Sequence, residues 1–125
     1  MSNIYFKGVK SIQYQNISEI EIILIEDYSK DKSLSIIEKI QKEDKRIRII
    51  KNKKNMGVLY SRSIGVLSAK GKYLFTLDND DLFLNNNIFD FTSKIAYEGK
   101  FDIVEFKAIS NRILNDDLIT NKLFI

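Results

Sequence analysis

A largely apolar run near the start of the chain limits the folds that this sequence can adopt. Residues 20–25 read Ile-Glu-Ile-Ile-Leu-Ile, so apolar side chains occupy both alternating sets of positions. A strand that is apolar on both faces needs cover on both faces, as do the strands of parallel sheets in α/β proteins. The run therefore predicts a central strand over residues 20–26, with helices packed on each side of its sheet.

Segments with the periodicity of helices and of strands alternate along the rest of the chain. Apolar side chains at helical spacing predict helices over residues 3–15, 32–43, 56–69 and 86–97. Short apolar or β-branched runs predict strands over residues 20–26, 47–51, 72–77 and 102–107. Such alternation is typical of a three-layer α/β/α fold with a mostly parallel sheet. We expect a single domain over residues 1–125.

Composition excludes several kinds of chemistry. The 125 residues include no Cys and no His, which rules out disulfides, thiolate metal sites and a histidine base. Catalysis would have to use carboxylates, Lys, Tyr, hydroxyls or a bound metal. No run approaches about 18 apolar residues, and the N-terminus lacks the pattern of a signal peptide. We therefore expect no membrane span and a cytoplasmic or membrane-associated location.

A basic segment in the middle of the chain raises the alternative of a nucleic-acid binder. Its cations are Lys39, Lys42, Lys45, Arg46, Arg48, Lys51, Lys53 and Lys54. The segment lacks interleaved aromatic side chains for base stacking, acids lie nearby, and the net charge is only +3. We therefore expect no nucleic-acid partner.

Three carboxylates follow the predicted strand 72–77, in the sequence Asp78-Asn79-Asp80-Asp81. Burying unpaired carboxylates costs roughly several kcal/mol each, so packing does not explain them. Ligands of α/β sheets bind at the carboxyl ends of the strands. A Mg²⁺ or Mn²⁺ ion with phosphate oxygens would relieve the repulsion between the like charges, because both ions prefer oxygen ligands. The alternative is a polar turn, since Asp and Asn are common turn residues.

Two further groups of polar residues are expected at the same edge of the sheet. Glu26-Asp27-Tyr28-Ser29 follows the first strand, and its acids can accept hydrogen bonds from a ribose or a base. Helix capping by Ser29 or Asp31 is the alternative for that group. Asn55-Met56-Gly57 opens the third helix, where backbone N–H groups favour an anion, and Arg62 lies one turn further on. The alternative there is a plain helix start with a surface arginine.

Together these segments resemble the glycosyltransferase family 2 domain of GT-A type. The matching segments are Glu21–Ser29, Asp44–Ile50, Asn55–Gly57, Arg62, Gly65, Ala69–Leu74 and Asp78–Asp80, with Asp81 after them. The first of these is similar to a family strand that ends in an Asp-Asp-Gly-Ser-like turn, and the last looks like the family's DxD motif. The similarity covers about Lys10 to Asn87 and continues more weakly to about Lys107.

The resemblance implies a domain that binds a nucleotide-diphosphate sugar, with a UDP-sugar as the favoured donor, and transfers the sugar to an unidentified sugar, lipid or protein acceptor. The nucleotide-sugar-binding residues that it implies are Glu26, Asp27, Ser29, Asn55, Gly57, Arg62, Asp78 and Asn79. By the same resemblance, Asp78, Asp80 and Asp81 would bind Mn²⁺ or Mg²⁺, which would neutralise the leaving diphosphate.

Three departures from the family pattern shape what we expect of this chain alone. Glu26 stands where the family usually has Asp. The family's opening strand, which lies between the strands 20–26 and 72–77, has no counterpart, and neither has the downstream half with its acidic general base. The catalytic base is therefore unassigned, and we expect a domain truncated at both ends, with a marginal fold and poor transfer activity. The alternative is a non-catalytic nucleotide-sugar-binding remnant or a truncated gene product.

Overall fold

The chain folds as helices and strands in the order α1, β1, α2, β2, α3, α4, β3, β4. The computed structural model describes residues 2–107 and 122–123. The helices among these residues are α1 (Ser2–Gln13), α2 (Ser33–Glu43), α3 (Val58–Ser68) and α4 (Ile88–Gly99). The strands are β1 (Ile22–Glu26), β2 (Ile47–Lys51), β3 (Phe106–Lys107) and β4 (Lys122–Leu123).

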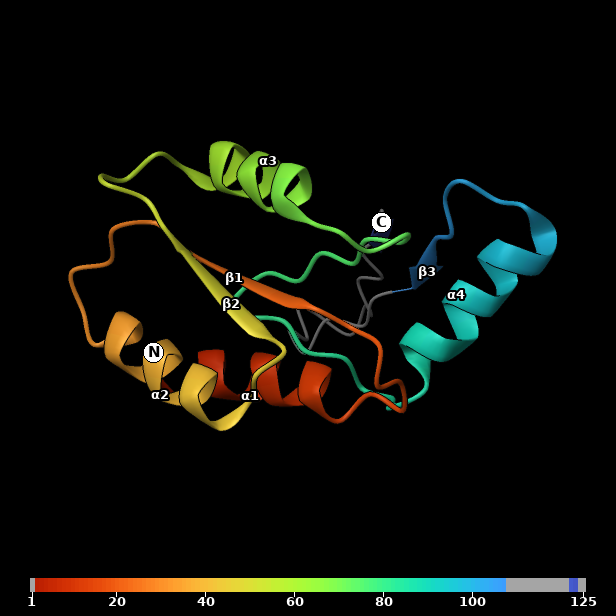
Figure 1. The fold of residues 1–125 in the computed structure, drawn as a ribbon, viewed down its shortest axis with the longest axis horizontal. Helices are drawn as coiled ribbons and strands as arrows, with labels where there is room; N and C mark the ends of the chain where they lie inside the picture. Colours follow the sequence, from red (N-terminus) through yellow and green to blue (C-terminus); the bar gives the residue numbers. More distant parts are fainter. Residues whose placement is uncertain (1, 108–121, 124–125) are drawn as a thin grey trace, which may run out of the picture.

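The strands β1 and β2 form a parallel pair at the centre of the structure. Ile22 lies opposite Ile47, and the register continues to Glu26 opposite Lys51. Figure 1 shows α3 on one face of this pair and α1 with α2 on the other. The predicted α/β class, with a parallel sheet covered on both faces, is therefore confirmed in a partial form.

A small apolar core lies between the strand pair and the helices α1 and α2. Val9 of α1 and Ile40 of α2 pack with Ile22 and Ile47 of the strands, and all four side chains are buried. Full burial of an aliphatic side chain stabilises a fold by roughly 1.5–3 kcal/mol. These contacts fix the directions of β1 and β2, and so the positions of the loops at their carboxyl ends.

The prediction of a strand over residues 72–77 is wrong. The segment has strand-like composition, but among the described residues it joins no ladder, and β1 pairs with β2 alone. Composition is not sufficient, because a strand also needs a neighbour that supplies ladder hydrogen bonds. Side-chain packing fixes the segment instead: the Phe75 ring stacks on Phe89 with 4.0 Å between centroids, and Phe83 packs edge-on against Phe89 at 4.9 Å.

Other element boundaries differ from the predicted ones for local reasons. The third helix begins at Val58 rather than at residue 56, because Gly57 has φ 85° and ψ 163°, outside the helical region. The predicted strand 102–107 shortens to β3, which pairs antiparallel with β4, so the sheets are not mostly parallel at this end of the chain. No helix in the described part of the chain has the length and apolarity needed to cross a membrane.

Candidate functional site

Asp27 is the first residue after β1, and its carboxylate joins three segments of the chain. Its Oδ1 accepts hydrogen bonds from the Asn52 side-chain amide at 2.8 Å and from the Met56 N–H at 2.7 Å. Its Oδ2 accepts the Gly57 N–H at 2.8 Å. Because β1 and β2 are parallel, the loops that follow them meet at one edge of the sheet. Residues 25 to 30 positions apart in the sequence therefore reach the same carboxylate.

These hydrogen bonds also fix the charge of the carboxylate. The Asn52 amide, and then the Met56 N–H, lower the pKa of Asp27 below its usual value, so the group is ionised at neutral pH. Asn52 also donates to the Ser61 Oγ at 3.1 Å. Asn52 was not among the predicted site residues. Its position directly after the predicted strand 47–51 is the one signal in the sequence that points to it.

The turn after β1 buries one acid and exposes an aromatic ring. The Glu26 side chain is buried, and its Oε1 accepts the Ser29 N–H. Tyr28 adopts the left-handed region with φ 61° and is 55% exposed. Asp31 Oδ1 accepts a backbone N–H in the first turn of α2 at 2.9 Å. Asp31 thus satisfies the first N–H of α2 although the N-cap residue is Lys32, and the acids that precede Asp31 accept their hydrogen bonds from residues outside this helix.

Gly57 occupies a backbone conformation that glycine alone adopts readily. Its φ is 85°, and a Cβ at this position would meet no atom of the described residues within 4 Å. Glycine is therefore required by the backbone and not by a close neighbour. Asn55, two residues earlier, is exposed. The start of α3 is consequently an exposed surface beside Asp27, where large apolar side chains such as Val58 and Leu59 also face solvent.

Arg62, in the second turn of α3, joins this helix to the acidic turn. Its Nη2 donates a hydrogen bond to Asp78 Oδ1, and the two side chains are 49% and 44% exposed. The Asp81 N–H donates to the Asp78 carbonyl at 3.1 Å, which closes residues 78–81 into a turn. Partial desolvation, and then the charges of Asp80 and Asp78, raise the pKa of Asp81. The three carboxylates therefore repel one another.

The three predicted groups of polar residues are connected through two contacts. Asp27 binds the loop before α3, and Arg62 of α3 binds Asp78. The Glu26 side chain is buried against the turn that follows it, where it binds the Ser29 N–H, whereas Asn55 and Asp80 are exposed. The metal site is less complete than the sequence suggests, because the described residues contain no group of three acidic side chains placed to hold a metal ion.

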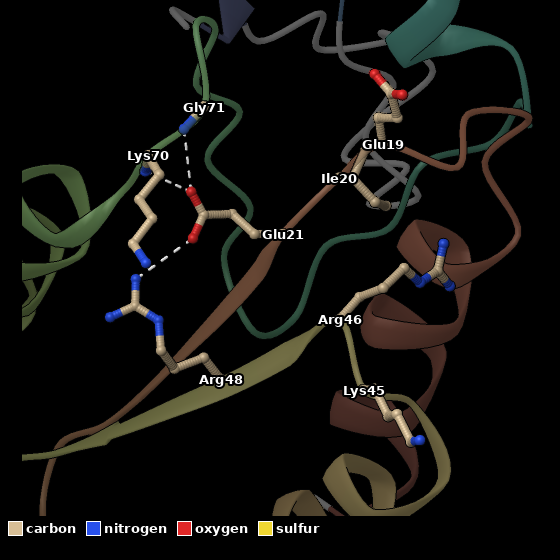
Figure 2. Close-up of a pocket in the computed structure, with 8 residues that line it drawn as sticks. All are labelled: Glu19, Ile20, Glu21, Lys45, Arg46, Arg48, Lys70 and Gly71. Carbon is tan, nitrogen blue, oxygen red and sulfur yellow. Dashed lines mark hydrogen bonds and ion pairs between the residues drawn. The ribbon is translucent and has the colours of Figure 1, made fainter.

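A surface pocket of about 500 Å³ lies at the other end of β1, away from these residues. Figure 2 shows Glu21 at its wall, with one carboxylate oxygen accepting the N–H groups of Lys70 and Gly71 and the other accepting from Arg48. Arg48 also donates to the Ser68 carbonyl at 2.6 Å. The Lys70 N–H is the main cause of the lowered pKa of Glu21. These interactions hold the C-terminal end of α3 against β1, which gives the pocket a structural explanation.

Comparison with known proteins agrees with this arrangement. The model of the family described as "Glycosyl transferase family 2" matches residues 7–118. An uncharacterized glycosyltransferase of Haemophilus influenzae is 39% identical over 82 residues, which are 66% of this chain and 33% of that protein. The uncharacterized glycosyltransferase EpsJ of Bacillus subtilis is 35% identical over 96 residues, 77% of this chain and 27% of that protein. A Campylobacter jejuni protein named GalNAc(5)-diNAcBac-PP-undecaprenol beta-1,3-glucosyltransferase is 34% identical over 94 residues, 74% of this chain and 30% of that protein.

A parallel βα core of this kind, matched to proteins named as glycosyltransferases, defines a partial α/β domain of the GT-A type. The chain belongs to glycosyl transferase family 2. It spans 33% or less of the length of these three relatives.

Proposed function

We propose that this chain is the donor-binding part of a glycosyltransferase and that it binds a nucleotide-diphosphate sugar together with a divalent cation. One observation supports this most directly: hydrogen bonds join Asp27 to Gly57 and Arg62 to Asp78. Polar groups from separate segments are thereby connected at the carboxyl edge of β1 and β2. This edge is where α/β sheets bind their ligands.

The nucleotide is assigned to the Asp27 side of this network. Asp27 Oδ2 accepts one N–H from Gly57, and a carboxylate oxygen can accept a second hydrogen bond from a base. The Arg62 guanidinium is suited to a phosphate oxygen, which would compete with Asp78 for the same donors. Glu26 is buried and would act by holding the turn that presents Ser29. The other proposed donor-binding residues are Asn55, Gly57, Asp78 and Asn79, and UDP is the favoured nucleotide.

The cation is assigned to Asp78, Asp80 and Asp81. All three supply carboxylate oxygens, which suit Mn²⁺ or Mg²⁺. Partial desolvation is the main cause of the raised pKa of Asp81, and the charges of Asp80 and Asp78 add to it. A cation would relieve the repulsion between these charges. Mg²⁺ is commonly held by one or two carboxylates together with substrate phosphates. Since the described residues hold no complete acidic metal cage, diphosphate oxygens would complete the coordination. When bound, the ion would neutralise the leaving diphosphate.

Transfer of the sugar is proposed for the family's complete form, to a sugar, lipid or protein acceptor. No general base is assigned in this chain, which therefore supports donor binding more directly than it supports turnover. The alternative is a nucleotide-sugar-binding protein that does not transfer the sugar. Donor binding without transfer from any nucleotide sugar of a panel would favour that alternative.

Calorimetric titration of UDP, with and without Mn²⁺, tests the proposal. We expect Mn²⁺ to strengthen UDP binding to the wild-type chain, and we expect Asp80→Ala to lose this enhancement because a charged ligand of the metal is removed. Asp90→Ala serves as the control, since Asp90 is an exposed acid on α4. An unchanged Mn²⁺ effect in both Asp80→Ala and Asp81→Ala would remove the metal assignment, and a wild-type chain that binds no nucleotide diphosphate would contradict the proposal itself.

A further inference from the structure

One face of α1 lies against the chain that follows the acidic turn. Gly8 and Ser11 are on this face of the helix, and Gln15 continues it just past the helix end. In Figure 1 the segment between α3 and α4 (green to teal) approaches the C-terminal end of α1. Polar residues of a helix face usually meet water, so polar contacts from this face to a distant segment need an explanation.

Gly8 allows α1 to approach the acidic turn closely. A Cβ added at Gly8 would lie 2.9 Å from the backbone carbonyl oxygen of Asp81 and 3.8 Å from Leu77 Cδ2. A separation of 2.9 Å is shorter than real Cβ contacts, and the neighbour is backbone, which cannot rotate away as a side chain can. Any larger residue at position 8 must therefore move α1 and the backbone at Asp81 apart.

Ser11 and Gln15 bind the next residues of the same segment. Ser11 Oγ donates to the Gly8 carbonyl at 2.7 Å and accepts the Phe83 N–H at 3.0 Å. Gln15 is only 5% exposed, and its Nε2 donates to the Asn85 carbonyl at 2.8 Å while its Oε1 accepts the Phe89 N–H at 3.2 Å. The backbone after the acidic turn is therefore bound at residues 83, 85 and 89 by Ser11 of α1 and by Gln15 just past its end.

The aromatic rings hold the turn from its other side. Phe75, which precedes the turn, stacks on Phe89, and Phe83 packs edge-on against both. Residues 78–81 are thus fixed at both ends, while Asp80 and Asp81 themselves are exposed. A rigid support beneath exposed carboxylates is what a cation with strict coordination distances requires.

We propose that Gly8, Ser11 and Gln15 are positioning residues that set the backbone of the turn 78–81, and through it the affinity for a cation-bound diphosphate. This inference rests on the proposed function for its second half. The partners that orient metal ligands commonly change metal affinity by roughly 10–100-fold when they are removed. The effect is expected on the metal-dependent part of UDP binding and not on the contacts around Asp27.

The sharpest test compares Gly8→Ala with Gly65→Ala. Both replace a helical glycine, but a Cβ at Gly65 would lie 3.5 Å from the flexible Ile25 Cδ1, an ordinary contact. We expect Gly8→Ala to shift the backbone amide resonances of residues 78–83 in metal-free protein and to weaken UDP binding in Mn²⁺ by roughly 10-fold. UDP binding without Mn²⁺ should weaken less than binding in Mn²⁺, and Gly65→Ala should alter neither measurement.

A second pair of variants keeps the test valid if Gly8→Ala does not fold. Ser11→Ala removes the hydroxyl that accepts the Phe83 N–H, whereas Ser11→Thr retains it. We expect Ser11→Ala to lose Mn²⁺-dependent affinity for UDP and Ser11→Thr to recover it.

The outcomes separate this inference from the function on which it rests. The inference would be overturned if Gly8→Ala and Gly65→Ala gave the same resonances for residues 78–83 and the same Mn²⁺-dependent affinity for UDP. The same holds if Ser11→Ala could not be told from wild type in these two measurements. A wild-type chain that shows no Mn²⁺-dependent UDP binding would overturn the proposed function and the claim about affinity. The amide resonances would then still decide whether α1 positions the turn.

Discussion

The guanidinium of Arg62 donates a hydrogen bond to the carboxylate of Asp78, 16 positions further along the chain. Both side chains are about half exposed, and ion pairs of this kind contribute only about 0–1 kcal/mol to stability. The pair therefore adds little to folding, although it joins α3 to the acidic turn. Its removal can test ligand binding almost independently of the fold.

We expect Arg62→Ala to weaken UDP binding by roughly 10–150-fold while the thermal midpoint hardly changes. The reason is the loss of a charge-assisted hydrogen bond to a phosphate, worth about 1.5–3 kcal/mol. Calorimetry and thermal unfolding measure the two effects. Arg48→Ala should instead lower the thermal midpoint and leave UDP affinity unchanged, because Arg48 binds Glu21 and the Ser68 carbonyl at the other end of α3. Equal loss of UDP affinity in both variants would contradict the assignment of Arg62.

Gly57→Ala should lower the free energy of unfolding by about 1–3 kcal/mol, because alanine is strained at φ 85° and ψ 163°. It should also weaken the hydrogen bond that Asp27 accepts from this N–H. Urea denaturation measures the change. Gly65→Ala is the comparison, since alanine is favoured over glycine inside a helix by roughly 0.5–1 kcal/mol. A Gly57→Ala variant as stable as Gly65→Ala would show that the backbone at this position is not strained.

Tyr28→Gly should raise the free energy of unfolding by roughly 0.5–1 kcal/mol. A left-handed conformation costs a non-glycine residue about 1–2 kcal/mol, and the extra freedom of glycine in the unfolded chain offsets part of the gain. Lys100→Gly is a matched variant far from the proposed site, because Lys100 also has a positive φ, 53°. Both should be stabilising in urea titrations.

Stability should fall at acid pH through Asp44. This side chain is 11% exposed and accepts hydrogen bonds from Arg46 and Gln13, and the bond from the Arg46 side chain is the main cause of its strongly lowered pKa. Since the folded pKa is depressed, the stabilisation is complete above the ordinary value of 3.8 and is lost as the pH falls below it.

Replacing Asp44 by Asn should therefore lower stability at neutral pH by roughly 1–2 kcal/mol and flatten the loss at acid pH. Chemical denaturation at several pH values measures this. Glu43→Gln changes an exposed acid one residue away and should leave the pH profile as in wild type. If the free energy of unfolding falls as steeply at acid pH in Asp44→Asn as in wild type, other carboxylates control the acid sensitivity.

The sequence predicts the parts of the fold that depend on local pattern. The apolar run that contains Ile22 determines β1, and the helical stripe that contains Ile40 determines α2, because burial alone selects those faces. The segment 72–77 shows the limit of this reasoning. Its composition favours a strand, yet a ladder needs a partner in register, and local pattern carries no information about a partner.

The site is predictable only in part, for a similar reason. Acids that follow an apolar run can be picked out in the sequence, and Asp27 and Asp78 are predicted as site residues for that reason. The hydrogen bond from Met56 to Asp27 spans 29 positions and depends on how two βα units pack. The close approach of Gly8 to Asp81 is equally invisible in the sequence, where a glycine in a helix indicates only a weak helix former.

The hydrogen bonds that Asp27 accepts hold the loop between β2 and α3 in place before any ligand binds. Ordering one backbone residue costs about 1–2 kcal/mol of conformational entropy, and a ligand does not have to supply that free energy for a loop that is already fixed. Association of UDP should then be a single diffusive encounter, with a rate that rises linearly with nucleotide concentration. Releasing the loop with Asp27→Ala should introduce a slower, saturating phase in stopped-flow traces, as the loop closes over nucleotide that has already arrived.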